Sequence, residues 1–152
     1  MRSLKTYEEK RPARTVEPPP VVCCPQQGLI REYSIQEHLA KKAGWHEDFR
    51  FADEGVALSF VFPKGMQFSG KESRLAVETE DHPVAYMSWE GEIPDGYGAG
   101  TLKLVEHGSL EILDRSKDKM RLRILDGSRR GTYQWVRSAK SPRQWFVRRV
   151  ED

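Results

Sequence analysis

From residue 30 onward, short runs of apolar or alternating residues are separated by Gly, Pro, Asp and Ser. Such runs predict β-strands, and their regular spacing is typical of a β-sandwich or barrel. Only residues 36–43 suit a helical turn or two. The sequence therefore predicts an all-β fold, a small closed or nearly closed barrel with little helix. We expect strands at residues 31–38, 46–51, 56–62, 74–80, 86–91, 101–106, 109–113, 119–125, 131–137 and 144–149.

The first 28 residues differ in composition from the rest of the chain. They contain five prolines and few apolar residues, which favours an extended conformation over a packed element. The whole length of 152 residues suits one domain. We therefore expect an extended N-terminal arm over residues 1–28 and a single barrel domain over residues 29–152.

Apolar segments and cysteines bear on where the protein works. No run of about 18 apolar residues is present, and the N-terminus lacks the apolar segment of a signal peptide. The two cysteines, Cys23 and Cys24, are adjacent, so a bond between them would be strained and no disulfide framework is expected. We expect a monomer in the cytoplasm, without membrane contact.

Charge is distributed unevenly although the net charge is only +2. Residues 1–114 contain 13 Lys and Arg against 19 Asp and Glu, whereas residues 115–152 contain 12 against 4. A basic C-terminal third predicts a nucleic-acid contact, with solvated strand faces as the alternative. In the last strand we expect Trp145 and Val147 to face the core, and Arg143, Arg148 and Arg149 to contact nucleic acid.

Candidate chemistry begins in the stretch His46-Glu47-Asp48-Phe49-Arg50-Phe51. Because side chains alternate between the faces of a strand, His46, Asp48 and Arg50 share one face and the phenylalanines share the other. Gln36 and His38 have the same two-residue spacing, as do Glu80 and His82. If these strands are neighbours, their polar faces converge on one pocket.

The donors in this pocket limit the metal that it could bind. A His, Asp and His set suits Mn²⁺, Fe²⁺ or Zn²⁺ and is too rich in nitrogen for Ca²⁺. The guanidinium of Arg50 beside such a metal indicates a phosphate ligand. Lys64 and Arg74 are expected to add positive charge around the same pocket.

Other conspicuous residues are assigned to structure. The glycine-rich residues 93–100 lack the Gly-Lys-Ser/Thr of a phosphate-binding loop and predict a tight corner between strands. His107 is expected in a hairpin turn between two strands. The four tryptophans offer surfaces for stacking on bases, although aromatic residues at alternate positions of a small barrel usually form its core.

The chain resembles the 3′-phosphoesterase domain of bacterial DNA ligase D and its stand-alone archaeal relatives. Almost the whole chain takes part in the resemblance. The stretches that carry it are QEH (36–38), HEDFR (46–50), FPKG (62–65), RLAVETEDHPVAY (74–86), EGEIP (90–94), YGAG (97–100) and WFVRRVED (145–152). That family forms a small β-barrel and trims 3′ ends of DNA with a divalent metal, typically Mn²⁺.

The resemblance implies roles for individual residues. The metal ligands fall on His38, Asp48 and His82, and the phosphate-binding and catalytic partners fall on His46, Arg50 and Tyr86. The residues expected to bind phosphate or substrate near the site are Gln36, Lys64, Arg74 and Glu80. The resemblance also implies Mn²⁺ as cofactor, with Zn²⁺ or Co²⁺ as substitutes, and DNA or DNA/RNA 3′ ends at primer–template junctions as substrate. A separate DNA ligase is the implied partner.

The N-terminal arm departs from the family pattern. Pro12 follows the basic pair Lys10-Arg11, where the family has an acid that supports removal of a terminal ribonucleoside. We therefore expect strong removal of a 3′ phosphate and weak removal of a 3′ ribonucleoside, unless Glu17 takes the place of the missing acid.

Two other classes of function stay open on sequence. A non-catalytic nucleic-acid-binding barrel would explain the basic third and the tryptophans, but it leaves the His/Asp/Arg face without a role. A 2-His-1-carboxylate iron oxygenase would use His46, Asp48 and His107.

Overall fold

The computed structural model describes residues 2–12, 16–22 and 28–150, and the strands dominate it. The elements in chain order are α1 (Lys5–Glu9), β1 (Ile30–Ala40), β2 (Gly44–Asp53), β3 (Val56–Phe62), β4 (Ser73–Glu78), the 3₁₀ helix η1 (Val84–Ser88), β5 (Gly91–Ile93), β6 (Gly100–Arg115), β7 (Lys119–Ile124), β8 (Gly131–Arg137) and β9 (Gln144–Val150). Neither helix in this described part of the chain is long and apolar enough to cross a membrane. Cys23 and Cys24 lie outside the described residues.

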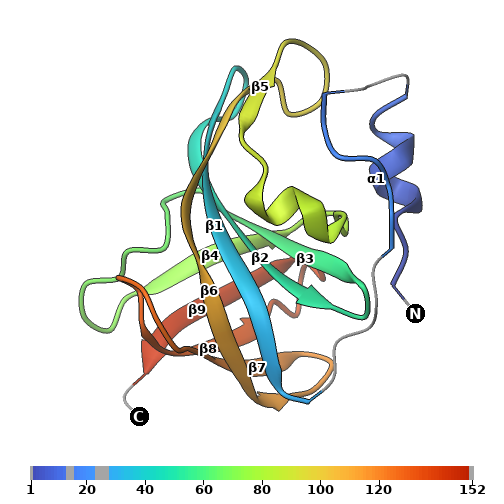
Figure 1. Cartoon of the computed structure of the whole chain (residues 1–152). Coiled ribbons are helices and arrows are strands. Elements are labelled where there is room, and N and C mark those ends of the chain that lie inside the picture. The colour runs from blue at the N-terminus through green and yellow to red at the C-terminus, as the bar shows by residue number, and fades with distance from the viewer. Residues whose placement is uncertain (1, 13–15, 23–27, 151–152) are drawn as a thin grey trace.

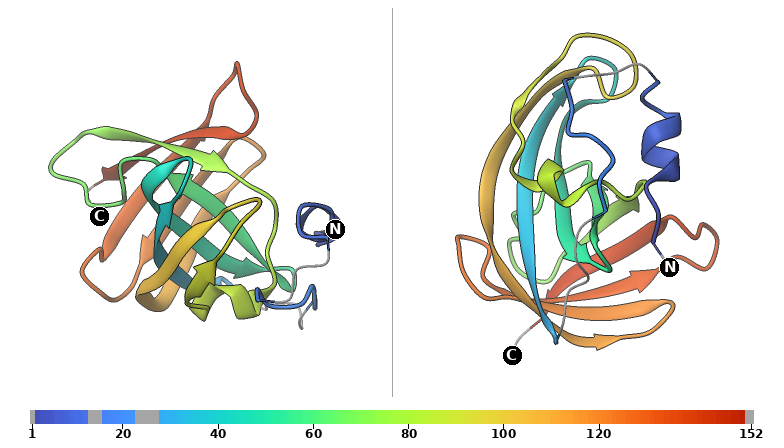
Figure 2. Two further views of the ribbon diagram at one scale, coloured as in Figure 1. Left: turned by 90° about the horizontal axis from the view of Figure 1, so that it is seen from above. Right: turned by 45° about the vertical axis from the view of Figure 1, so that its right-hand side comes forward.

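The strands form one antiparallel sheet that curls into a ring, which confirms the predicted all-β fold (Figures 1 and 2). The order is β1-β2-β3-β4-β9-β8-β7-β6-β5, and pairing of β1 with β6 closes the ring. The join between β3 and β4 is short, with only Phe60 opposite Glu78 and Val61 opposite Val77. Short β5 pairs with β6 alone, outside the ring.

The interior of the ring is packed with aromatic side chains. Phe49 and Phe51 of β2 point inward and are fully buried, as is Trp135 of β8, whose ring centroid lies 4.8 Å from that of Phe60. Burial of an aromatic side chain contributes roughly 1.5–3 kcal/mol relative to its exposure. The interior therefore stabilises the fold, and His46, Asp48 and Arg50 of β2 lie on the outer face.

Residues 86–91 do not form the predicted strand. Pro83, with φ of −62°, precedes a 3₁₀ helix in which the Tyr86 amide donates to the Pro83 carbonyl. Over so few residues, apolar alternation does not distinguish a strand from a single helical turn. As a result Tyr86 reaches the outer face of β1 and β2 from a helix.

Residues 101–106 and 109–113 belong to one long strand, β6, so the predicted turn at His107 is wrong. Gly108 does not form a turn. It lets the side chain of Asp126 approach the strand closely, because a Cβ atom at this position would lie 2.0 Å from Oδ1 of Asp126. His107 is an exposed strand residue opposite Ser34. The helical turn expected at residues 36–43 is also wrong, since β1 continues to Ala40 and turns back at Gly44, where φ is +75°.

Residues 2–12 and 16–22 lie along the outside of the sheet (Figure 2). They include α1, whose Tyr7 is buried and donates a hydrogen bond of 2.5 Å to the carbonyl oxygen of Pro18. Residues 94–99 form a loop with positive φ at Gly96 and Gly98, which confirms the predicted corner. Figure 2 shows α1 and the chain that follows it beside η1 and this loop.

Candidate functional site

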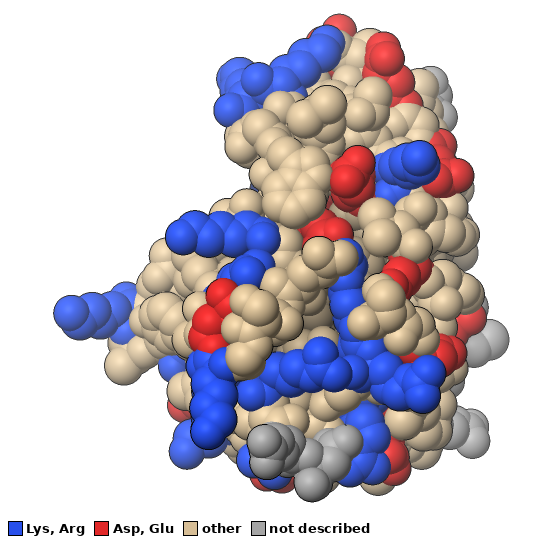
Figure 3. All heavy atoms as spheres, turned by 90° about the vertical axis from the view of Figure 1, so that its left-hand side faces the viewer, with Lys and Arg blue, Asp and Glu red and all other residues tan. Residues whose placement is uncertain are grey.

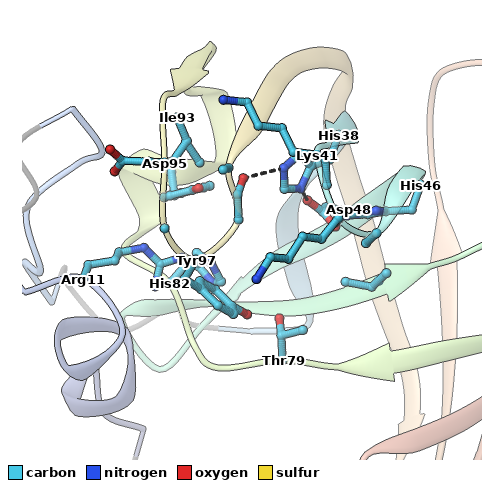
Figure 4. Close-up of a pocket in the computed structure, with 18 of the residues that line it drawn as sticks. Arg11, His38, Lys41, His46, Asp48, Thr79, His82, Ile93, Asp95 and Tyr97 are labelled. Carbon is cyan, nitrogen blue, oxygen red and sulfur yellow. Dashed lines mark hydrogen bonds and ion pairs between the residues drawn. The ribbon is translucent and has the colours of Figure 1, made fainter.

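A cavity of about 670 Å³ opens on the outer face of the β1–β2–β3 wall (Figure 4). Its floor consists of polar side chains of β1 and β2. Loop 93–99, η1 and the arm cover it, and the arm contributes Arg11. The predicted convergence of polar strand faces is therefore present, and four residues of the floor are His38, His46, Asp48 and Arg50.

His38, His46 and Asp48 come together at one end of this floor. His38 lies opposite His46 in the pairing of β1 with β2, and Asp48 follows two residues later on the same face. Nε2 of His46 lies 3.2 Å from Oδ1 of Asp48, and Nδ1 of His38 lies 3.6 Å from Oδ2. One potential ligand atom from each residue lies within 4.8 Å of the other two, and all three side chains are buried.

The orientation of His38 follows from its other ring nitrogen. Nε2 lies 2.8 Å from the carbonyl oxygen of Gly98 and donates a hydrogen bond to it, so Nδ1 carries a lone pair that faces Asp48. Loop 93–99 thus fixes the tautomer of a potential ligand, as hydrogen-bonded carbonyls do for metal-binding histidines.

The three residues fit a divalent cation. Oδ1 of Asp48 is buried and receives no well-formed hydrogen bond from the described residues. Burial alone would raise the pKa of Asp48, but the adjacent imidazoles of His38 and His46 and the charge of Arg50 hold this pKa far below its usual range. A buried ionised carboxylate facing imidazole nitrogen suits Mn²⁺, Fe²⁺, Co²⁺ or Zn²⁺.

Arg50 is held on every side of its guanidinium group. Nε donates to Oε1 of Gln36 at 2.6 Å, Nη1 to Oγ of Ser59 at 2.8 Å and Nη2 to Oδ2 of Asp48 at 3.2 Å. The guanidinium carbon also lies 4.6 Å from the centre of the Tyr86 ring. A charge fixed in this way needs little reorganisation when a phosphate approaches.

Gln36 and Ser59 are positioning residues. The Gln36 amide nitrogen donates to the carbonyl oxygens of Tyr86 and Trp89, which ties η1 to β1. Ser59 contacts both Arg50 and Nδ1 of His82, at 3.0 Å from the latter. Ser59 is not among the residues predicted from the sequence, although its place in β3 beside a strand with alternating polar residues is a usable signal.

His82 lies across the cavity from the three potential ligands and is not part of their group. Its Nδ1 donates to the carbonyl oxygen of Glu80 at 2.8 Å, so Nε2 is an acceptor. Burial and the charge of Arg50 hold the pKa of His82 well below the usual value. The structure therefore brings His46, rather than His82, together with His38 and Asp48, because His46 lies two residues before Asp48 on the same face of β2.

The arm adds a second cation that was not predicted from the sequence. Arg11 is buried and donates from Nε to Oε2 of Glu17 at 2.7 Å and from Nη1 to Oε2 of Glu80 at 3.0 Å. Its Nη2 lies 3.4 Å from Nε2 of His82. Its place in the basic pair before Pro12 is the signal that the sequence offers.

Glu17, Glu80 and Tyr86 complete this side of the cavity. The Tyr86 hydroxyl donates to Oε2 of Glu17 at 2.8 Å, and Lys10 donates to Oε1 of Glu80 at 2.9 Å. Burial opposes ionisation of Glu80, yet His82, Lys10 and Arg11 lower its pKa to about 2. Glu80 therefore holds the arm in place as an ionised carboxylate, and it is not among the residues that line the cavity.

Several expected site residues lie away from the cavity. Arg74 donates to the backbone oxygens of Lys64 and Gly65, so it stabilises the loop after β3, and neither Lys64 nor Arg74 lines the cavity. His107 lies 3.7 Å from Glu32 on the surface, so the set of His46, Asp48 and His107 expected for an oxygenase is not assembled.

The basic residues of the tail are divided between the two ends of β9. Arg143 donates to the carbonyl oxygen of Glu78, next to Thr79 of the cavity wall, whereas Arg148 and Arg149 lie at the far end of the strand. Trp145 and Val147 face the core and Phe146 and Arg148 face outward, as predicted.

Comparisons with known proteins identify the family of the chain. Residues 36–137 match the model of the family described as the DNA Ligase D 3′-phosphoesterase domain. The chain is 43% identical over 110 residues to the multifunctional non-homologous end joining protein LigD of Mycolicibacterium smegmatis, covering 71% of this chain and 14% of that protein. It is 34% identical over 160 residues to the protein of the same name from Pseudomonas aeruginosa, covering 98% of this chain and 19% of that protein.

The matched part, residues 36–137, begins within β1 and contains His38, His46, Asp48, Arg50, His82 and Tyr86. The chain spans less than a fifth of the length of these curated relatives. The chain belongs to the DNA ligase D 3′-phosphoesterase domain family.

Proposed function

We propose that the protein is a metal-dependent phosphoesterase that processes 3′ ends of DNA during non-homologous end joining, removing a 3′ phosphate to leave a 3′ hydroxyl for ligation. The observation that carries the proposal is the group of His38, His46 and Asp48 beside the immobilised Arg50. Family membership and the names of the relatives, which describe end-joining proteins, support the same class of reaction.

The metal is proposed to be Mn²⁺, bound by His38, His46 and Asp48. It would supply Lewis-acid polarisation of a phosphate oxygen. Arg50 faces the same space and neutralises negative charge on the phosphate, and the nearby Arg11 guanidinium adds a second positive charge.

Neutral His82 is positioned to accept a proton. Its Nε2 carries the lone pair and lies 3.4 Å from Nη2 of Arg11 in the cavity wall, while Glu80 and Ser59 hold Nδ1. In hydrolysis, water adds to phosphorus, the bond from phosphorus to the 3′ oxygen breaks, inorganic phosphate is released, and the sugar oxygen takes up a proton from solvent to become the 3′ hydroxyl. We assign to His82 the acceptance of a proton from the attacking water.

A labelled primer–template ending in a 3′ phosphate tests this function. Conversion to a 3′ hydroxyl with Mn²⁺ and its loss with EDTA are expected. No conversion with Mn²⁺, Co²⁺ or Zn²⁺ would refute the proposal.

An iron oxygenase is a second candidate, because two histidines and one carboxylate also form the donor set of that class. The two arginines in the cavity favour a phosphate over an organic cosubstrate. Release of phosphate by the Mn²⁺-bound protein in the absence of oxygen would favour the phosphoesterase over the oxygenase.

Removal of a 3′ ribonucleoside is proposed to be weaker than removal of a 3′ phosphate. The arm presents Glu17, but Arg11 and Tyr86 already occupy its Oε2. Equal rates on a primer with one 3′ ribonucleotide and on the 3′-phosphate primer would contradict this expectation and would favour Glu17 as the substitute for the missing acid.

A further inference from the structure

Trp45 differs from the other tryptophans in its exposure. Trp135 and Trp145 are core residues and Trp89 packs partly against the core, whereas Trp45 is 44% exposed. It precedes His46 on β2, so the two side chains point to opposite faces of the strand. The indole lies against the turn after β3, where a Cβ atom on Gly65 would come within 2.8 Å of it. An exposed aromatic surface therefore lies one residue from the proposed metal group.

The same end of the barrel contains a cluster of cations, here called the basic end. Its members lie after β3, at the start of β4, in the turn between β7 and β8 and at the end of β9, and they are Lys64, Arg74, Arg130, Arg148 and Arg149. Two hydrogen bonds link members of the cluster: Arg74 donates to the Lys64 carbonyl, and Arg149 donates to the Arg130 carbonyl. Figure 3 shows Lys and Arg side chains gathered across the lower part of this side of the molecule.

The charges of the basic end are largely uncompensated. Within the described part of the chain, no hydrogen bond or ion pair engages the side chains of Lys64, Arg130 and Arg148. The contact between Arg74 and Glu72, at 3.2 Å, joins this cluster to a carboxylate. Exposed cations in such a cluster attract a polyanion and release its counterions on binding.

We propose that Trp45 and the basic end bind a single-stranded segment of the nucleic acid whose 3′ end occupies the cavity, with a base stacked on the indole and phosphates against the cations. This inference rests on the proposed function. An aromatic platform beside cations is the combination by which proteins bind single strands without sequence preference. Lys41 and Lys42, in the turn from β1 to β2, line the cavity and carry positive charge from the cavity toward Trp45.

An unpaired strand fits this surface better than a duplex does. The face of the indole is available only to a base that is not stacked within a helix, and every base offers such a face. The basic end supplies the backbone contacts that give affinity but no sequence preference. Binding is therefore expected to favour single strands and to be insensitive to sequence.

Charge reversal tests the basic end. The probe is a fluorescent single-stranded oligonucleotide ending in a 3′ hydroxyl, titrated at several salt concentrations. The variant R130E/R148E is expected to weaken binding at least about tenfold and to reduce the salt slope by roughly 0.7 for each phosphate that the protein no longer neutralises. Lys119→Glu is the matched control, because Lys119 is exposed at the opposite end of β7. Equal weakening by the control, or an unchanged slope in the variant, would overturn the proposal.

Substitution of Trp45 tests the stacking. Trp45→Ala is expected to weaken single-strand binding by about 5- to 100-fold, the range for one stacked base, and Trp45→Phe should restore part of this loss. Binding of a blunt duplex should change little. Equal affinity of Trp45→Ala and the wild type for the single strand would refute stacking, as would tighter binding of the blunt duplex than of the single strand by the wild type.

These titrations need neither metal nor turnover. A protein that binds the oligonucleotide as described but never releases phosphate would refute the proposed function and leave the surface standing. The opposite result would refute the surface alone. Circular dichroism of each variant confirms that the fold is retained.

Discussion

Strands β2 and β9 both direct aromatic side chains into the core, but they differ in whether their outward-facing residues are buried. Phe49 and Phe51 of β2 and Trp145 of β9 all point into the aromatic core. Outward residues of β2, such as Asp48, are buried beneath η1, the loop after β5 and the arm, whereas Phe146 of β9 is exposed. The site therefore exists where polar outward residues are covered. Burial beneath these segments shifts the pKa values of the polar residues and limits the access of water, whereas an exposed strand face does neither.

The largest expected effect comes from the covered face. Asp48→Asn keeps the size of the side chain but removes the charge that balances a divalent cation. We expect 3′-phosphatase activity to fall by more than the roughly 10–100-fold that accompanies loss of a hydrogen-bond partner of a ligand. Calorimetric titration with Mn²⁺ should show weaker binding, with Asp118→Asn, on the exposed turn before β7, as the control. Near wild-type turnover would remove Asp48 from the metal group.

Arg50→Lys should be the next most severe change. A lysine cannot reproduce three donors directed at Gln36, Ser59 and Asp48, so the charge is no longer fixed. We expect a loss of about 100-fold in kcat, the usual cost of removing a preorganised donor. Steady-state kinetics on the 3′-phosphate primer measure it, and a normal rate would show that positive charge alone suffices.

Ser59→Ala is expected to cost about tenfold, because Ser59 positions Arg50 and His82 without touching substrate. A structural role alone would leave the pH dependence of kcat unchanged. We expect the acidic limb of the pH profile to move, since His82 Nδ1 loses a partner, and Ser59→Thr to restore it. An unmoved profile would contradict the assignment.

The cover itself is expected to be sensitive to pH. The pKa of Glu80 is about 2 in the folded protein, against 4.5 for an ordinary glutamate, so the ionised form favours folding. This stabilisation is complete above about pH 4.5 and is lost as the pH falls toward 2. Glu80→Gln should therefore lower the free energy of unfolding by a few kcal/mol at pH 7 and by much less at pH 3. Denaturant titrations at both pH values compare the variants, and a loss independent of pH would show that the ionised carboxylate is not responsible.

The smallest effect is expected on the open face. Phe146→Ala should change the free energy of unfolding within about 0.5 kcal/mol, because Phe146 is 47% exposed. Val147→Ala, one residue later and fully buried, should cost more by a clear margin. Comparable losses would mean that the outward face of β9 is covered in solution.

Alternation along single strands made much of this architecture predictable. It placed His46, Asp48 and Arg50 on one face of β2, and Trp145 and Val147 on the inner face of β9. The prediction was wrong where one short sequence pattern fits two different local structures. Gly108 permits contact with Asp126 rather than a turn, and the apolar residues around Tyr86 form a 3₁₀ helix.

The assignment of the histidines required tertiary information. His82 follows Glu80 with the same spacing that places His46 beside Asp48, so spacing alone does not show which imidazole meets His38. Pairing of β1 with β2 decides in favour of His46. Arg11 reaches Glu80 across 69 residues of chain, a distance over which no local pattern operates.

The attachment of the arm has a consequence for where the molecule can be divided. The family match begins at residue 36, yet Arg11 is a hydrogen-bond partner of both Glu17 and Glu80. A protein trimmed to the matched region would leave the buried Glu80 without Lys10 and Arg11, and the Tyr86 hydroxyl without its acceptor. Expression fragments and fusions of this module therefore need to begin ahead of α1, because the family match begins after the arm residues that contact Glu80 and Tyr86.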